Sequence, residues 1–300
     1  MPLGSGHFTP TTHNVYRPDI WSPRVNRAFE KKHVMGKICL NLSDTLATNG
    51  GKSIIIPNLS NLVANQKVVG QQVTLQAPTE TAVTLQINNH YESSILIEKF
   101  LAETVGYDLK ALYAEKLGYA VANKFDETLT GLYAAVPGTN VIGNQTTPIS
   151  DALIRQSIRI LEADYDVPYD EMCFVFHPAL KEQLYDIPKY YDAASFGIAP
   201  TSEGAGLVAS GTMRTLYGIP VYFSPNVVKA AVGGGNAYHN FLLHKEAFAY
   251  AIAPGSGSYD NVNLESSYIQ EYLGTLVTAY MIWGVAATRP TAVVVIRTQA

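Results

Sequence analysis

The alternation of apolar and polar side chains over residues 68–88 constrains the fold most, because it matches a two-stranded ribbon with one apolar face. We predict one arm at residues 72–76 and the other at residues 83–87, joined by a turn at Pro78-Thr79-Glu80. A two-stranded ribbon alone is barely stable in water. Its apolar side chains are therefore expected to bury against another subunit. These side chains are Val73, Leu75, Val83, Leu85 and Ile87.

Composition favours a folded protein that makes large contacts. The chain has 300 residues, of which 47% are hydrophobic and only 15% are charged, so it can bury a sizeable core. It carries 19 Tyr and 10 Phe, and amphipathic aromatic residues suit surfaces that become contacts, although a tyrosine-rich monomer would have the same composition. The net charge of −4 excludes the broad basic excess of a dedicated nucleic-acid binder. Any contact with nucleic acid is expected to be local and independent of sequence.

Cysteine usage and hydropathy indicate folding in a reducing cytoplasm without membrane insertion. Cys39 and Cys173 are the two cysteines, too few for a disulfide framework, and Cys173 lies in an apolar run that predicts a buried, reduced thiol. Residues 1–16 contain no apolar signal core, and no apolar run approaches the length of a membrane span.

The start of the chain has the composition of an extended arm. Residues 1–20 show no periodicity, so we expect them to be ordered by contact with something else. A short helix is predicted next, with Ser22 as its cap and Pro23 at its first position. Its cations form either a solvated face, which is the favoured interpretation, or an inward face that meets nucleic acid or an acidic partner protein. These cations are Arg24, Arg27, Lys31 and Lys32.

A short strand and a long helix are predicted on either side of the ribbon. Ile54-Ile55-Ile56-Pro57 indicates a strand that ends at the proline. Apolar residues at every fourth position from Val105 to Tyr133 predict a helix over about residues 101–135, roughly 45 Å long. Because four residues advance roughly 400°, the apolar stripe winds around the helix and needs different partners along its length. A core helix of one large domain is the alternative.

The second half of the chain predicts an α/β lobe. From Thr147, short helices alternate with strands: a helix capped by Ser150, a strand over residues 173–176, and a helix opened by His177-Pro178. Residues 187–211 are predicted to be a long exposed loop. Further strands are expected at residues 221–223, 238–243 and 292–296.

No motif indicates catalysis or metal binding. Ser256 lies in a glycine-rich stretch that does not match a nucleophile elbow. His239 and His244 are five residues apart on a predicted strand, which places them on opposite faces, and no cysteine or carboxylate cluster accompanies them. We therefore predict no enzyme activity, no cofactor and no metal site.

Several local sequences follow one another in an informative order. They are Val83-Thr84-Leu85-Gln86-Ile87 before His90-Tyr91, then Tyr119-Ala120-Val121-Ala122 with Asp126, then Gly218-Ile219-Pro220-Val221, and then Lys245-Glu246-Ala247. Their order, together with the layout of arm, protruding loop, long helix and α/β lobe, resembles the major capsid proteins of tailed bacteriophages. That family has the Hong Kong 97-type fold.

The resemblance implies an α+β fold with four parts. These are an N-terminal arm at residues 1–35, an extended loop at residues 58–89, a peripheral domain at residues 36–57, 90–147 and 255–285 that contains the spine helix, and an α/β axial domain at residues 148–254 and 286–300.

It also implies a function. The subunits would form pentamers and hexamers of an icosahedral virion capsid that encloses double-stranded DNA and is assembled in the host cytoplasm. A separate scaffolding protein, a portal and possible decoration proteins would be partners. Some relatives crosslink a lysine to an asparagine, but Lys67 and Asn65 are expected at the loop base, so that chemistry is not predicted. Two alternatives stay open: an encapsulin-like compartment shell and a soluble α/β hydrolase.

Overall fold

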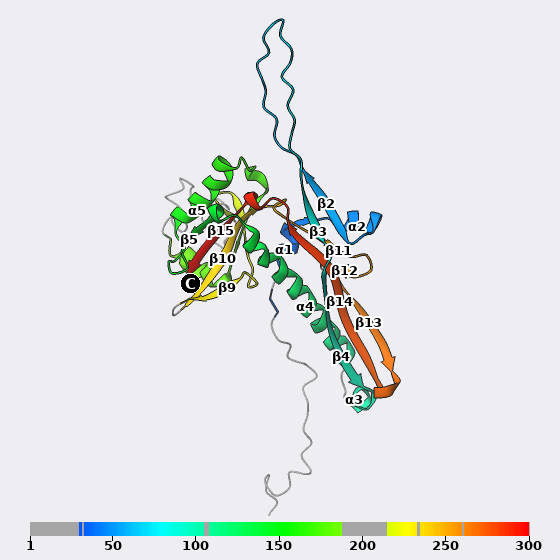
Figure 1. Cartoon of the computed structure of the whole chain (residues 1–300). Coiled ribbons are helices and arrows are strands. Elements are labelled where there is room, and N and C mark those ends of the chain that lie inside the picture. Colours follow the sequence, from blue (N-terminus) through cyan, green and yellow to red (C-terminus); the bar gives the residue numbers. More distant parts are fainter. Residues whose placement is uncertain are drawn as a thin grey trace, which may run out of the picture. The chain divides into compact units, whose positions relative to one another are not determined.

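The computed structural model describes residues 30–31, 33–104, 108–187, 215–232, 235–259 and 261–299. The chain divides into two units, residues 1–30 and residues 31–300, and every described helix and strand belongs to the second unit (Figure 1). The predicted helix with Arg24, Arg27 and Lys32, and most of the predicted loop at residues 187–211, lie outside the described residues. Interpretations that rest on them stay predictions.

A six-stranded sheet is organised around β14. This long strand pairs antiparallel with β4 along one edge and with β11 and β13 along the other, and β1 and β12 extend the sheet. Along β14, fully buried residues alternate with partly exposed ones over most of its length, as expected when one face of a sheet is covered. The strands are β1 (Leu40–Asn41), β4 (Asn89–Glu98), β11 (Phe248–Ile252), β12 (Gly257–Ser258), β13 (Asn261–Ile269) and β14 (Gly274–Ala287).

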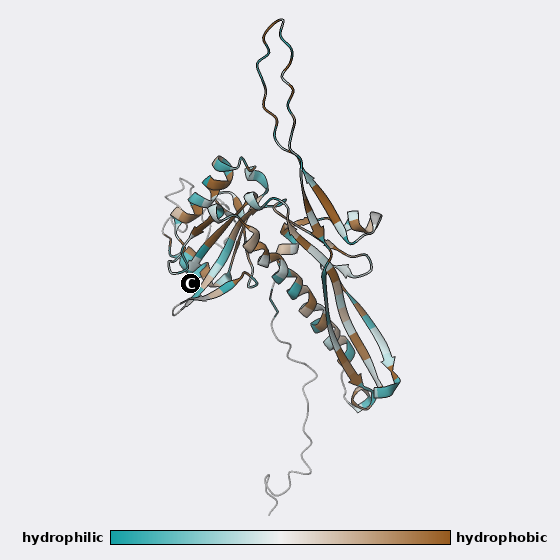
Figure 2. Cartoon of the chain, viewed as in Figure 1, coloured by the Kyte–Doolittle hydropathy of each residue, from teal (hydrophilic) through white to brown (hydrophobic). Residues whose placement is uncertain are grey.

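Helix α4 (Leu109–Thr130) packs on the covered face of this sheet, where Figure 2 shows hydrophobic residues along the neighbouring strands. Its apolar stripe places Val121, Phe125 and Leu129 in the core. The predicted single helix over residues 101–135 is wrong in extent. Asp108 has ψ of 84° and its carboxylate accepts a hydrogen bond from the Ala111 amide, so it caps a new helix after α3 (Lys99–Thr104). A 3-10 turn, Gly131–Ala135, replaces the predicted last turn.

A seven-stranded sheet forms the predicted α/β part of the chain. The strand order is β5-β15-β10-β6-β8-β7, and β9 also pairs with β10. The strands expected at residues 173–176, 221–223, 238–243 and 292–296 are all present. They belong to β5 (Val141–Gly143), β6 (Met172–Phe176), β7 (Thr215–Leu216), β8 (Ile219–Phe223), β9 (Lys229–Val232), β10 (Gly235–His244) and β15 (Val293–Gln299).

Two helices accompany this sheet at the predicted places. Helix α5 (Asp151–Arg159) begins after Ser150, although the Ser150 side chain makes no capping hydrogen bond. A π turn, Ile160–Asp164, continues it. Pro178 opens a 3-10 turn that leads into α6 (Lys181–Tyr185).

The predicted ribbon of residues 72–76 with residues 83–87 is wrong. Strand β3 (Thr81–Gln86) pairs instead with β2 (Ser53–Asn58), in a register that sets Ile56 opposite Val83. Residues 72–76 form no strand, and the chain reverses at residues 68–71, where the Gln71 amide donates to the Val68 carbonyl and Gly70 has φ of 85°. The alternation of apolar residues is a correct strand signal for β3, but a local pattern cannot identify the partner strand.

Strand β3 is anchored on the body of the subunit. Leu85 is fully buried with Leu46 of α2 (Ser43–Asn49), Ala249 and Ala251, whereas Val83 and Ile87 are partly buried against the same cluster. A Cβ atom on Gly284 of β14 would lie 2.2 Å from the Gln86 carbonyl oxygen, so the strands meet at a position that only glycine allows. The expectation that Leu85 buries against another subunit is therefore wrong, because its own chain already covers it.

Substituting Leu85 by alanine is expected to lower the free energy of unfolding by about 3 kcal/mol, because it leaves a cavity in a packed cluster. Denaturant unfolding followed by circular dichroism measures this change. Val73→Ala removes a similar apolar group from a side chain that is 55% exposed, and should change stability by no more than about 0.5 kcal/mol. Equal effects of the two substitutions would contradict the assigned burial.

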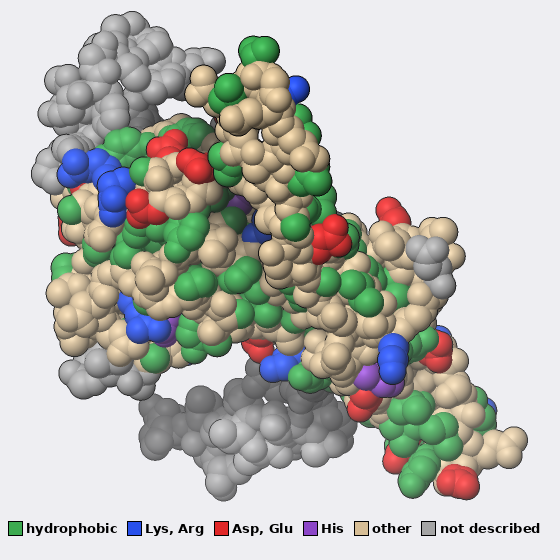
Figure 3. Space-filling model, turned by 45° about the horizontal axis from the view of Figure 1, so that its top comes forward, with side chains coloured by type: hydrophobic (Ala, Val, Ile, Leu, Met, Phe, Trp, Pro, Cys, Tyr) green, Lys and Arg blue, Asp and Glu red, His purple; other side chains and the backbone are tan. Residues whose placement is uncertain are grey.

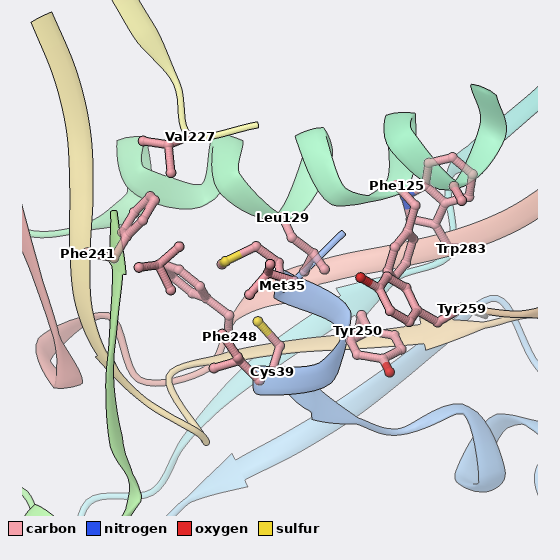
Figure 4. Packing of buried hydrophobic residues seen from close by; sticks show 14 of the residues in the cluster. Met35, Cys39, Phe125, Leu129, Val227, Phe241, Phe248, Tyr250, Tyr259 and Trp283 are labelled. Carbon is pink, nitrogen blue, oxygen red and sulfur yellow. The ribbon is translucent and has the colours of Figure 1, made fainter. Parts of the chain in front are cut away.

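One hydrophobic cluster joins the two large sheets, and a segment near the start of the described chain completes it. Met35 of α1 (Met35–Ile38) is fully buried beneath α4, near Leu129 and Phe248 (Figure 4). Cys39 and Cys173 belong to the same cluster as free thiols, as predicted, and burial raises the pKa of Cys173 to about 12. The core of the subunit therefore depends on residues at the end of the predicted arm and just after it, from Val34 to Cys39.

Candidate functional site

The connection between β2 and β3, residues 59–80, carries the most exposed apolar surface of the described chain. We call it the extended loop (Figure 1). Val69 is 98% exposed and Leu75 is 84% exposed. Its charged residues are Lys67 and Glu80, and Figure 3 shows little blue or red on it. Apolar side chains held in water at such density mark an interaction surface. The large ones are Leu59, Leu62, Val63, Val68, Val69, Val73 and Leu75.

The two arms of the extended loop are joined by one side chain. The carboxamide oxygen of Gln76 accepts a hydrogen bond from the Val63 amide at 3.0 Å, and its nitrogen donates to the Val63 carbonyl oxygen. No residue between 59 and 80 belongs to a strand. The loop is thus held by its apex turn, by Gln76 and by the β2–β3 ladder at its base.

A second exposed apolar surface lies where β13 turns into β14. We call it the apolar tip, and hydrophobic side chains gather at this end of the sheet in Figure 3. The Lys99 amide donates to the Leu273 carbonyl at 2.9 Å, which joins α3 to the turn. Leu273 has φ of 45°, a left-handed conformation that costs about 1 kcal/mol for a leucine. The apolar tip consists of Phe100, Leu101, Tyr268, Tyr272 and Leu273, which are 48–78% exposed.

A buried carboxylate connects three parts of the subunit. Asp126 of α4 is fully buried, and one of its oxygens accepts hydrogen bonds from the Val34 and Met35 amides at 3.2 and 2.8 Å. Its other oxygen accepts from Asn226 at 3.0 Å and from Ser224 at 3.4 Å. The segment before α1, helix α4 and the loop after β8 are therefore fixed to one another through this side chain. Sequence reasoning named Asp126 as part of the family resemblance but did not predict its buried hydrogen bonds.

The predicted contact residues divide between exposed and buried positions. Val73 and Leu75 lie on the extended loop and are exposed, whereas Leu85 is buried and Val83 and Ile87 are partly buried. Sequence reasoning missed Val69 and the apolar tip. Tyr268, Tyr272 and Leu273 stand close together in the sequence beside Gly274, and this aromatic cluster next to a turn signal could have indicated the tip.

The structure places Lys67 differently from the expectation and leaves the predicted role of Lys31 untested. Lys67, with Asn65, was expected at the base of the extended loop, but both lie beside its apex at residues 68–71. The backbone amide of Lys31 donates to the Tyr119 hydroxyl of α4 at 2.9 Å. The predicted role of Lys31 in a basic face stays a prediction, because its predicted companions lie outside the described residues.

The described residues do not assemble a metal site. No group of three histidine, cysteine, aspartate or glutamate side chains among them could hold a metal ion. His239 and His244 share strand β10, and they contact different partners, Tyr133 and Glu171 respectively. No helix within the described ranges is long and apolar enough to cross a membrane.

Comparison with solved structures shows which known proteins share this fold. The chain is similar to one from Mycobacterium phage Che8, with a TM-score of 0.74 and 18% sequence identity, over 94% of this chain and 97% of that one. It is similar to the capsid structure of the cyanophage P-SCSP1u, with a TM-score of 0.69 and 16% identity, over 99% and 96% of the two chains. It is also similar to the capsid of Ralstonia phage GP4, with a TM-score of 0.68 and 12% identity, over 95% and 96%.

These likenesses extend over nearly the whole of both chains in every case. No family model and no curated protein matches the sequence. The protein therefore has an α+β fold of the kind found in bacteriophage capsids, which confirms the fold class predicted from the order of its sequence elements. The predicted domain boundaries stay predictions.

Proposed function

We propose that this protein is the major capsid protein of a tailed bacteriophage. Its subunits form pentamers and hexamers, which close into an icosahedral shell around double-stranded DNA. The observation that carries the proposal is the end-to-end likeness to chains from bacteriophage capsids, combined with an extended loop whose apolar side chains are exposed in the described subunit.

The exposed surfaces support self-association rather than catalysis. The extended loop and the apolar tip together offer two different surfaces on one chain. Contacts between unlike surfaces generate closed rings when the rotation between copies closes. We therefore assign the protein a structural, non-enzymatic role in the virion capsid.

Further partners follow from this proposal. A separate scaffolding protein and a portal direct assembly in the host cytoplasm, and decoration proteins can bind the finished shell. The enclosed DNA is contacted locally and without sequence preference, because a chain with a net charge of −4 lacks the broad basic excess of a dedicated nucleic-acid binder. The less favoured interpretation of Arg24, Arg27, Lys31 and Lys32, an inward basic face, would supply such a contact.

Negative-stain electron microscopy of the purified protein tests the proposal. Expressed alone, or together with the proteins encoded beside it, the chain is expected to form closed particles of uniform diameter. Monomers or dimers under both conditions, with hydrolase turnover, would support the soluble enzyme instead. Particles that hold a cargo enzyme and no DNA, in cells where the gene is native, would support the encapsulin-like compartment.

A further inference from the structure

We propose that Gln76 is a positioning residue for assembly: it holds the two arms of the extended loop at a fixed spacing before the loop meets a neighbouring subunit. The inference rests on the proposed function, and it assigns a role to a residue that touches only its own chain.

The position of Gln76 is that of a cross-strand partner. Val63 and Gln76 lie the same number of residues from the turn at Val69 and Gly70, so they face each other across the loop. In an antiparallel sheet, facing residues of one kind exchange both backbone N–H and C=O hydrogen bonds. Here the carboxamide of Gln76 makes both bonds to Val63 in place of the Gln76 backbone. The arms are consequently farther apart than the roughly 4.8 Å between strands of a sheet.

No other side chain of residues 59–80 forms a hydrogen bond between the two arms. All residues from 59 to 80 are described, and the further hydrogen bond within the loop is the one at its apex, from the Gln71 amide to the Val68 carbonyl. Gln72 is also exposed, on the same arm, and makes no such bond across the loop. The spacing of the arms between apex and base therefore depends on Gln76.

Fixing the arms matters because ordering a loop costs conformational entropy when it binds. A loop whose arms are already spaced presents Val69 and Leu75 in one arrangement, and less entropy is lost when these side chains dock. Both hydrogen bonds, between the Gln76 side chain and the Val63 backbone, are exposed to solvent, so their loss should hardly alter the stability of the subunit. Gln76 is therefore expected to act on assembly and not on folding.

Distance measurements on the unassembled subunit test the first half of the proposal. Asn65→Cys and Thr74→Cys place two spin labels at facing positions near Gln76, and the native thiols are buried and do not compete for the label. We expect a narrow distance distribution that broadens at least twofold with Gln76→Ala. Gln72→Ala, the matched control, should leave it unchanged. An unchanged distribution with Gln76→Ala overturns the proposal.

Assembly measurements test the second half. Gln76→Ala should raise the subunit concentration needed for particle formation by about fivefold, as loss of roughly 1 kcal/mol per subunit would. Gln76→Glu, which keeps the shape but loses the donor to the Val63 carbonyl, should do the same, whereas Gln72→Ala should not. Unaltered melting temperatures must accompany these changes.

The outcomes separate the two proposals. A broadened distribution with an unchanged assembly threshold overturns the positioning role of Gln76 and leaves the proposed function intact. Failure of the unsubstituted chain to form particles under any condition overturns the proposed function, and the positioning role with it.

Discussion

Replacing Val69 and Leu75 together by glutamate is expected to abolish closed particles while leaving the subunit folded. The two side chains are 98% and 84% exposed in the subunit, so the substitutions remove little packing within it. In the assembled shell each would bury an apolar group worth about 2 kcal/mol, and the glutamates would instead place charges in that interface. Electron microscopy should show no particles, and circular dichroism should show an unchanged melting temperature.

A matched variant separates loss of the apolar side chains from added charge. Gln72→Glu with Thr74→Glu adds the same number of charges to the extended loop but keeps every apolar side chain. This variant should still form particles, at reduced yield. Particles of normal size and yield from the Val69 and Leu75 variant would show that the extended loop makes no essential contact.

Asp126→Ala is expected to lower the free energy of unfolding by about 3 kcal/mol, because it leaves the Val34 and Met35 amides and the Asn226 carboxamide buried without their acceptor. For a chain of this size that corresponds to roughly 5 °C in melting temperature. Differential scanning calorimetry measures the change. Hydrogen exchange should also show faster exchange of the amides of α1.

The neighbouring residue provides the control for this prediction. Glu127 is partly exposed, accepts from Asn123, and pairs with Lys124 at 3.4 Å. Glu127→Ala should cost less than about 1 kcal/mol, as surface ion pairs do. If the two alanine variants unfolded at the same temperature, Asp126 would not be the connection between α1, α4 and the loop after β8.

Local patterns predict elements well and partners poorly. Alternation at Val83 and Leu85 identifies strand β3, and Ile54 to Ile56 identify β2, but neither pattern shows that the two strands pair with each other. The pairing of β2 with β3 leaves a connection, residues 59–80, that is longer than most connections in compact domains. A short turn at Pro78 has the usual length, and the predicted ribbon is therefore built on that turn. The same alternation at Val73 and Leu75 predicts a strand where there is none, because a strand needs a partner.

The helix and its buried carboxylate show what periodicity alone leaves out. The apolar stripe that begins at Val105 continues past Asp108 and so predicts one unbroken helix, although an aspartate before a helical run is a capping signal. Asp126 follows Phe125 and lies one turn after Ala122, both of them core residues. A carboxylate at that place in the stripe indicates a buried hydrogen-bond acceptor. Its partners could not be predicted, because they lie about a hundred residues away in both directions.

The anchoring of β3 has a mechanical consequence. Strand β3 is joined to β2 by a ladder of six residue pairs, and it meets the main sheet through Leu85 and at Gly284. A tensile force on the extended loop, such as outward pressure from tightly packed contents would produce, pulls β2 and β3 in the same direction and is resisted where β3 meets the body of the subunit, at Leu85 and Gly284. Because the ladder holds the two strands together, both arms of the extended loop transmit this tension through β3 to the rest of the subunit.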